Sequence, residues 1–207
     1  MTQQPTARRG ARPLTFLACA LLALCTASCT TFFPVLPERQ SWADEALQKA
    51  GRMKSIEAFG RDIEPTLIQV RNELINESNF NERQSWDYIY SQPVDNMQLY
   101  TLVSPTISFV EDDVRKVQAV VKSQLTPLGF TVQTREQTTE DNENETLISA
   151  ANPTYGVTVN VYVRDSKRAN FLYETQPLKS DGSTDNPMEV ADIPGRRPDW
   201  MVLTPPE

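Results

Sequence analysis

The chain has 207 residues, of which 27 are acidic, 20 are basic and none is histidine, so its net charge is −7. Without histidine, the Ser-His and Cys-His nucleophile systems and the common zinc sites are excluded. The acidic balance argues against a nucleic-acid partner, because phosphate binding needs a basic surface. The 7 glycines are spaced too widely for a phosphate-binding loop or a dinucleotide fingerprint, so we predict no cofactor.

The N-terminal segment has the organisation of an export signal. Arginines precede an apolar run over residues 14–24, and the small residues Ala27 and Ser28 come directly before Cys29. As a helix the run would span about 16 Å, which is too short to cross a bilayer. We therefore predict a cleaved signal peptide over residues 1–28 and lipid attachment to Cys29.

Two other cysteines compete for this role. Leu24 is too bulky for the position before Cys25, and cleavage at Cys19 would leave too short an apolar core. Thr26 replaces the leucine that usually lies three positions before a lipidated cysteine. A plain signal peptide with an unlipidated Cys29 is an alternative, as is twin-arginine export.

Removing the signal leaves 179 of the 207 residues, and the net charge changes from −7 to −10 because three arginines and no acid are lost. This length is enough for one domain. Cys29 would then be the sole cysteine, which rules out an intramolecular disulfide. We predict that residues 29–40 form a lipidated tether, held stably when more than one acyl chain is attached. The apolar residues at 32–36 would either enter the lipid interface or pack on the domain.

Residues 41–78 carry apolar side chains at helical spacing, which is typical of a buried helix face. Pro65 interrupts the pattern, because proline lacks the backbone donor that a helix interior needs. The pattern predicts two helices, over residues 41–60 and 64–77, or one kinked helix. A short strand is predicted next, over residues 86–90.

One further helix follows a strand predicted over residues 98–103. The spacing from Ser108 to Glu111 predicts a capping box that starts this helix. The acidic triplet at residues 111–113 would lie in the first turn, where the helix dipole favours negative charge. Pro127 would end the helix.

Four more strands are predicted in the second half of the chain. They cover residues 130–134, 146–151, 157–164 and 169–175. Valine occupies every second position of the third strand, which is the period of a strand with one buried face. An acidic loop over residues 136–145 precedes the last three strands, which would form an antiparallel meander. After Pro177, the proline-rich residues 178–207 predict a largely irregular tail that drapes over the domain.

These elements predict an α+β fold class in a single domain over residues 41–177. An N-terminal helix or helix pair would pack with a mainly antiparallel sheet of about four to five strands, crossed by one further helix (β-α-β-β-β).

Three parts of the sequence carry a family resemblance. They are Thr26-Ala27-Ser28-Cys29, residues 108–131 and the turn around Asn152-Pro153. Together with the order of the elements, they resemble a group of small membrane lipoproteins from actinobacteria that are largely of unknown function. The resemblance implies the fold and a location at the cell membrane, and it implies no catalytic residues.

One pattern has the spacing of a metal site. Asp181, Ser183 and Asp185 occupy alternate positions, as the oxygen ligands of a calcium loop do. Asn186 stands where such a loop needs glycine, and Pro187 interrupts the pattern. A solvated polar loop is therefore the preferred interpretation, and no metal is predicted.

No residue is predicted to be catalytic. The leading prediction is a non-enzymatic, lipid-anchored binding or interaction module on the extracytoplasmic face of the cell membrane. Its partners would be the membrane, through lipid on Cys29, and an envelope protein or a small ligand. Tyr155, Tyr162, Phe171 and Tyr173 would either line a ligand groove or pack across strands. The alternative is an extracytoplasmic enzyme that acts on a cell-envelope substrate through paired carboxylates, a pair that spacing alone does not identify.

Overall fold

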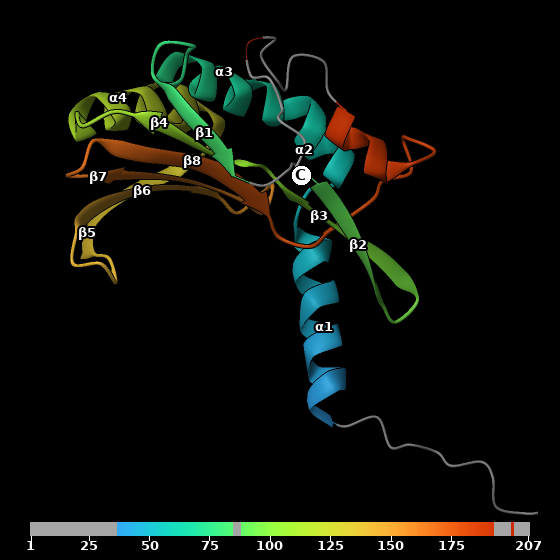
Figure 1. The fold of residues 1–207 in the computed structure, drawn as a ribbon. Coiled ribbons are helices and arrows are strands. Elements are labelled where there is room, and N and C mark those ends of the chain that lie inside the picture. The colour runs from blue at the N-terminus through green and yellow to red at the C-terminus, as the bar shows by residue number, and fades with distance from the viewer. Residues whose placement is uncertain (1–36, 85–87, 193–199, 201–207) are drawn as a thin grey trace, which may run out of the picture. The chain divides into compact units, whose positions relative to one another are not determined.

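The structure of the protein is a computed structural model. It describes residues 37–84, 88–192 and 200 (Figure 1). The chain divides into two compact units, residues 1–39 and 40–207, and the second unit holds nearly all of the described residues.

Several sequence predictions lie outside the described residues. These are the signal peptide, Cys29 with the tether up to residue 36, and the tail beyond residue 192 apart from Trp200. No helix within the described ranges is long and apolar enough to cross a membrane.

The described part of the chain contains four α-helices. They are α1 (Pro37–Arg52), α2 (Ile56–Asp62), α3 (Glu64–Leu74) and α4 (Val114–Leu125). The predicted interruption near Pro65 is confirmed, since α2 and α3 are separate helices that meet at Ile63. The sequence does not predict a second interruption between Arg52 and Ser55. Ser55 caps α2, because its Oγ accepts a hydrogen bond from the Ala58 N–H at 3.0 Å.

Nine strands form one sheet, and all of their pairings are antiparallel in the part of the chain that the structure describes. They are β1 (Phe80–Gln84), β2 (Tyr88–Val94), β3 (Met97–Val103), β4 (Thr106–Val110), β5 (Thr131–Thr138), β6 (Asn144–Asn152), β7 (Val157–Arg164), β8 (Arg168–Thr175) and β9 (Leu178–Lys179). The order is β1-β4-β8-β7-β6-β5, and β3 pairs with β8, β2 and β9. The predicted α+β class is confirmed, but the sheet is larger than four to five strands, since β1, β4 and β9 are additional.

Ser108 does not begin a helix. It lies in β4 between β1 and β8, where it is fully buried and its hydroxyl donates a hydrogen bond to Asn170 Oδ1. The helix α4 begins instead after Asp113, whose carboxylate accepts hydrogen bonds from the backbone N–H groups of Arg115 and Lys116. The predicted capping box is therefore wrong, because β4 pairs with strands on both sides and this pairing overrides the local capping signal.

The helices α2, α3 and α4 cover one face of the sheet, and the core lies between these layers (Figure 1). In β7 the valines are buried, whereas the alternating residues, such as Tyr162, are half-exposed on the opposite face. This alternation and the antiparallel meander of β6, β7 and β8 are confirmed. The largest fully buried side chains are Phe59, Phe109 and Phe171.

The first part of the predicted irregular tail belongs to the fold. Leu178 is fully buried, β9 pairs with β3, and a short 3-10 helix, η2 (Pro187–Asp192), follows. The predicted acidic loop over residues 136–145 is also shorter than expected, because β5 extends to Thr138 and β6 begins at Asn144.

Candidate ligand pocket

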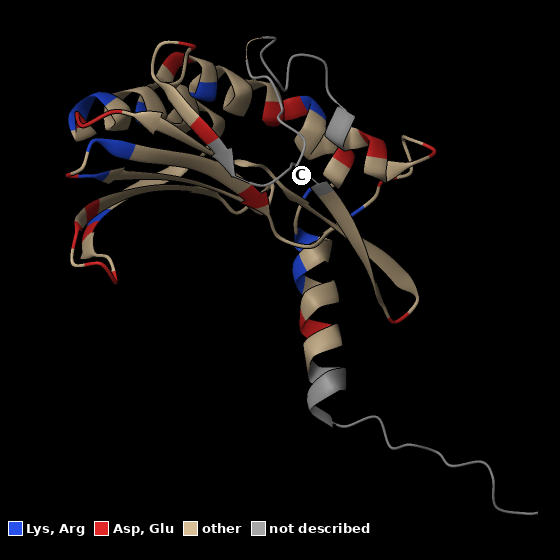
Figure 2. Cartoon of the chain, viewed as in Figure 1, with Lys and Arg blue, Asp and Glu red and all other residues tan. Residues whose placement is uncertain are grey.

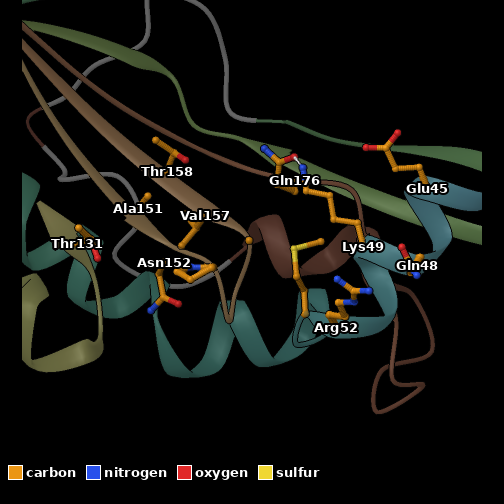
Figure 3. A pocket seen from close by; sticks show the side chains of 13 residues that line it. Glu45, Gln48, Lys49, Arg52, Thr131, Ala151, Asn152, Val157, Thr158 and Gln176 are labelled. Carbon is orange, nitrogen blue, oxygen red and sulfur yellow. Dashed lines mark hydrogen bonds between the residues drawn. The ribbon is translucent and has the colours of Figure 1, made fainter. Parts of the chain in front are cut away.

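An open cavity of about 690 Å³ lies between the last two turns of α1 and the adjoining ends of β5, β6 and β7 (Figure 3). Figure 3 shows the α1 side chains on one side of it and Thr131 and Ala151 on the other. Small-ligand sites typically measure about 300–1,000 Å³, so the cavity has a suitable size. Its lining residues are Glu45, Gln48, Lys49, Arg52, Met53, Thr131, Ala151, Asn152, Pro153, Gly156, Val157, Thr158 and Gln176.

The turn between β6 and β7 forms one wall of the pocket. Asn152 is buried and fixes this turn, because its Oδ1 accepts hydrogen bonds from the N–H groups of Thr154 and Tyr155 at 3.0 and 3.3 Å. Its Nδ2 donates to the Leu128 carbonyl at 2.9 Å. The Lys54 N–H in turn donates to the Thr154 carbonyl at 2.8 Å. The chain that leaves α1 is therefore held directly against this turn.

Gly156 allows the close approach of the two walls. Its φ is +60°, and a Cβ at this position would lie 2.4 Å from Met53 Sδ and 3.1 Å from Leu178 Cδ2. Met53 is buried against it and contributes, with Pro153 and Val157, to an apolar pocket interior. A larger residue at Gly156 would push these walls apart.

The α1 rim of the pocket is positively charged. Lys49 and Arg52 lie in the last turn of α1, where the helix dipole favours cations. Figure 2 shows the blue of basic residues at this end of the helix. Lys49 Nζ donates to the uncharged Gln176 Oε1 at 2.9 Å. Within the described ranges, neither cation forms an ion pair with an acid. Among the described lining residues, Glu45 is the one carboxylate.

The pattern considered for calcium serves a structural role. Asp181 accepts hydrogen bonds from Ser55 Oγ at 2.6 Å and from the Ser183 N–H at 2.9 Å. Hydrogen bonds lower the pKa of Asp181 to about 2, the one from Ser183 contributing most and the one from Ser55 next. The buried Glu57 of α2 accepts a further hydrogen bond from the Asp181 N–H at 3.1 Å, so this segment is fastened to α2. Asp185 is exposed, and the described residues contain no group of three or more His, Cys, Asp or Glu that could hold a metal.

A more polar cavity, of about 410 Å³, collects three carboxylates at the opposite ends of β5 and β6. It is lined by Glu136, Glu145 and Asp165. Glu145 is buried, and its oxygens accept hydrogen bonds from Arg164 Nε and Gln137 Nε2, each at 2.7 Å. Both oxygens of this carboxylate are thus engaged in contacts that hold the strands together.

The four aromatic residues considered for a ligand groove do not share a surface. Phe171 and Tyr173 are buried in the core, where the Tyr173 hydroxyl donates to the buried Glu64 carboxylate at 2.7 Å. Tyr162 lies on the opposite face of the sheet, and Tyr155 is half-exposed. The groove interpretation is therefore wrong, and the packing interpretation holds for Phe171 and Tyr173.

The basic residues of the pocket are not among the predicted site residues. The sequence marks the Asn152-Pro153 turn, but Lys49 and Arg52 carry only the signal of helical spacing, which places them on one face of α1. That spacing does not show which part of the fold this face of α1 lies against. The pocket itself is built from segments about 100 residues apart in the chain.

Fold and pocket together define an α+β domain with an antiparallel sheet, one helix-covered face and a ligand-sized cavity at one end of the sheet. The chain belongs to the family described as "Domain of unknown function (DUF4853)", whose model matches residues 52–186. A solved structure with a similar fold is the crystal structure of a DUF4853 family protein from Actinomyces odontolyticus ATCC 17982. It is 17% identical, has a TM-score of 0.51, and the match covers 68% of this chain and 82% of that chain. No curated protein matches the chain.

Proposed function

We propose that this chain is a lipid-anchored, non-enzymatic binding module of the bacterial cell envelope, which holds a small ligand in the pocket between α1 and β5–β7. The observation that carries the binding role is the cavity of about 690 Å³ with an apolar interior. Apolar surface that remains open to solvent at a concave site is characteristic of ligand-binding grooves.

The proposed anchor is Cys29. Its support is the order of the sequence: arginines, a short apolar run, and Ala27 and Ser28 before the cysteine. Because α1 begins at Pro37, only a short segment separates the proposed lipid from the domain. The resemblance to actinobacterial lipoproteins, which includes the segment Thr26-Ala27-Ser28-Cys29, agrees with this proposal.

The arrangement of carboxylates favours binding over the enzymatic alternative. Glycosidase chemistry needs two carboxylates about 5–9.5 Å apart, one on each side of the reacting bond. Among the described lining residues of the pocket, Glu45 alone is acidic. In the more polar cavity, Arg164 and Gln137 engage Glu145, and Asn144 donates a hydrogen bond to Asp165. The two carboxylates other than Glu145 there, Glu136 and Asp165, are exposed to solvent rather than held in a closed site.

Fractionation of cells tests the anchor. We expect Cys29→Ala to release the protein from the membrane fraction, because no lipid can then be attached. Cys19→Ala and Cys25→Ala are matched controls that should leave the protein with the membranes. Membrane retention of the Cys29→Ala variant would refute the anchor at this residue.

Photolabelling of the full chain in membrane vesicles tests the pocket. With an uncharged fatty alcohol that carries a diazirine, we expect label on peptides that contain Met53 and residues 151–158. Ala151→Trp would fill the cavity and reduce this labelling. Ala119→Trp, at an exposed position of α4, would not. Equal labelling of the two variants would refute the proposed pocket.

A further inference from the structure

We propose that the ligand of this pocket is an anionic amphiphile, with an alkyl chain against the apolar interior and a carboxylate or phosphate head at Lys49 and Arg52. The inference rests on the proposed function of the pocket as a ligand site. It specifies the chemical class of the ligand, which the size of the cavity alone does not define.

The interior of the pocket selects an apolar ligand body. Met53, Pro153 and Val157 present carbon and sulfur atoms to the cavity. The buried Asn152 beside them has its amide already satisfied by the Leu128 carbonyl and two backbone N–H groups. Against Met53, Pro153 and Val157, a polar ligand would therefore lose hydrogen bonds to water without replacing them.

The rim selects a negative head group. Lys49 and Arg52 are three residues apart in one helical turn, so they lie on the same side of α1. Elsewhere in the described structure some basic side chains pair with acids, whereas others, such as the exposed Arg115 and Lys122, form no ion pair there. The ion pairs involve Arg61, Lys116, Arg164, Lys167 and Arg168. Lys49, by contrast, donates to the neutral Gln176, and the described residues supply no acid in ion-pair contact with Arg52.

Two negative features of the rim offset the charge of the two exposed cations only in part. The C-terminal end of a helix carries about half a negative charge, less than one of the two cations. Glu45 lies four residues before Lys49, one helical turn away, and so offsets part of the Lys49 charge. It lies seven residues before Arg52, about 10 Å along the helix, a distance at which physiological salt screens much of the attraction. An anionic head group would complete the charge balance at Arg52.

The combination favours an anionic amphiphile over two simpler ligands. A neutral apolar molecule would fill the interior but gain nothing from the two exposed cations, which would stay solvated by water. A free inorganic anion would pair with the cations but leave the apolar interior in water. An anionic amphiphile satisfies both parts of the pocket at once.

Photolabelling of the full chain in membrane vesicles with two matched probes tests the inference. The probes are a diazirine-bearing fatty acid and the fatty alcohol of the same chain length. The double variant Lys49→Gln/Arg52→Gln should reduce pocket labelling by the acid about 3- to 30-fold, as expected for two partly solvated charge pairs, and leave labelling by the alcohol unchanged. Arg115→Gln/Lys122→Gln makes the same charge change at exposed positions of α4 and should alter neither.

Competitors distinguish an anionic amphiphile from a free anion. Unlabelled dodecanoate and dodecyl phosphate should both suppress labelling by the acid, whereas inorganic phosphate should not. Suppression by inorganic phosphate alone would overturn the amphiphile. If Lys49→Gln/Arg52→Gln does not change labelling by the acid, the preference for an anionic head group is refuted, but the proposed pocket is not. Absence of pocket labelling by either probe would instead refute the proposed function.

Discussion

The replacement of Gly156 by alanine probes the contact that forms the pocket. Gly156 is buried and has a φ of +60°, a left-handed conformation that side-chain-bearing residues adopt at a cost. The added methyl group would lie 2.4 Å from Met53 Sδ and 3.3 Å from Gln176 Cβ. The substitution therefore combines backbone strain with a collision against buried neighbours.

Both contributions can be estimated. The left-handed conformation costs an alanine about 1–2 kcal/mol. Forcing an additional methyl group into packed surroundings costs about 1–3 kcal/mol. Because Met53 is flexible and borders the open cavity, we expect the lower part of the combined range, a loss of about 2–3 kcal/mol in the free energy of unfolding. For a domain of this size that corresponds to a fall of about 4–12 °C in the melting temperature.

Two other glycines supply matched controls in thermal and urea unfolding followed by circular dichroism. Gly182 has a φ of +74° but open space around it, so Gly182→Ala should show the backbone strain alone, about 1–2 kcal/mol. Gly51 lies in α1 with nothing within 4 Å, and Gly51→Ala should stabilise the protein by about 0.5–1 kcal/mol. If Gly156→Ala costs no more than Gly182→Ala, the proposed collision with Met53 is refuted.

Two further substitutions have defined outcomes. The pKa of Asp181 in the folded protein, about 2, lies below the unfolded value of about 3.9. The ionised carboxylate therefore stabilises the fold above about pH 4, and this contribution is lost as the pH falls toward 2. Between about pH 4 and 2, the free energy of unfolding of the Asp181→Asn variant should therefore fall less than that of the unmodified protein. Identical acid-denaturation profiles of the two proteins would contradict the role of the hydrogen bonds that Asp181 accepts from Ser55 and Ser183. Asn152→Ala leaves the Leu128 carbonyl and two backbone N–H groups without their side-chain partner. The free energy of unfolding, measured in urea, should fall by about 1–3 kcal/mol. A change of less than about 0.5 kcal/mol would show that water replaces the amide.

The features that were predicted correctly are those with a strong local pattern. The valine alternation of β7 identifies its buried face, because side chains of a strand point alternately to opposite sides. The short turns on both sides of β7 then place β6 and β8 as antiparallel neighbours. Pro65 likewise marks the boundary of α3, because a proline is accommodated in the first turn of a helix.

The features that were missed depend on contacts between distant parts of the chain. Ser108 has the spacing of a helix cap, yet its segment becomes β4 because β1 and β8 pair with it on either side. The break after Arg52 has a similar cause, since the Lys54 N–H bonds to the Thr154 carbonyl, and an uninterrupted helix would not present it there. Neither partner can be inferred from the neighbouring residues in the sequence.

The sequence by itself determined the fold class and the meander, because periodicity and proline positions are local quantities. The tertiary structure alone decided where the pocket lies. It brings Lys49 and Arg52 of α1 to the turn at Asn152 and Gly156, about 100 residues further along the chain. The same proximity explains why Gly156 must lack a side chain: the Met53 sulfur occupies the place that a Cβ would take.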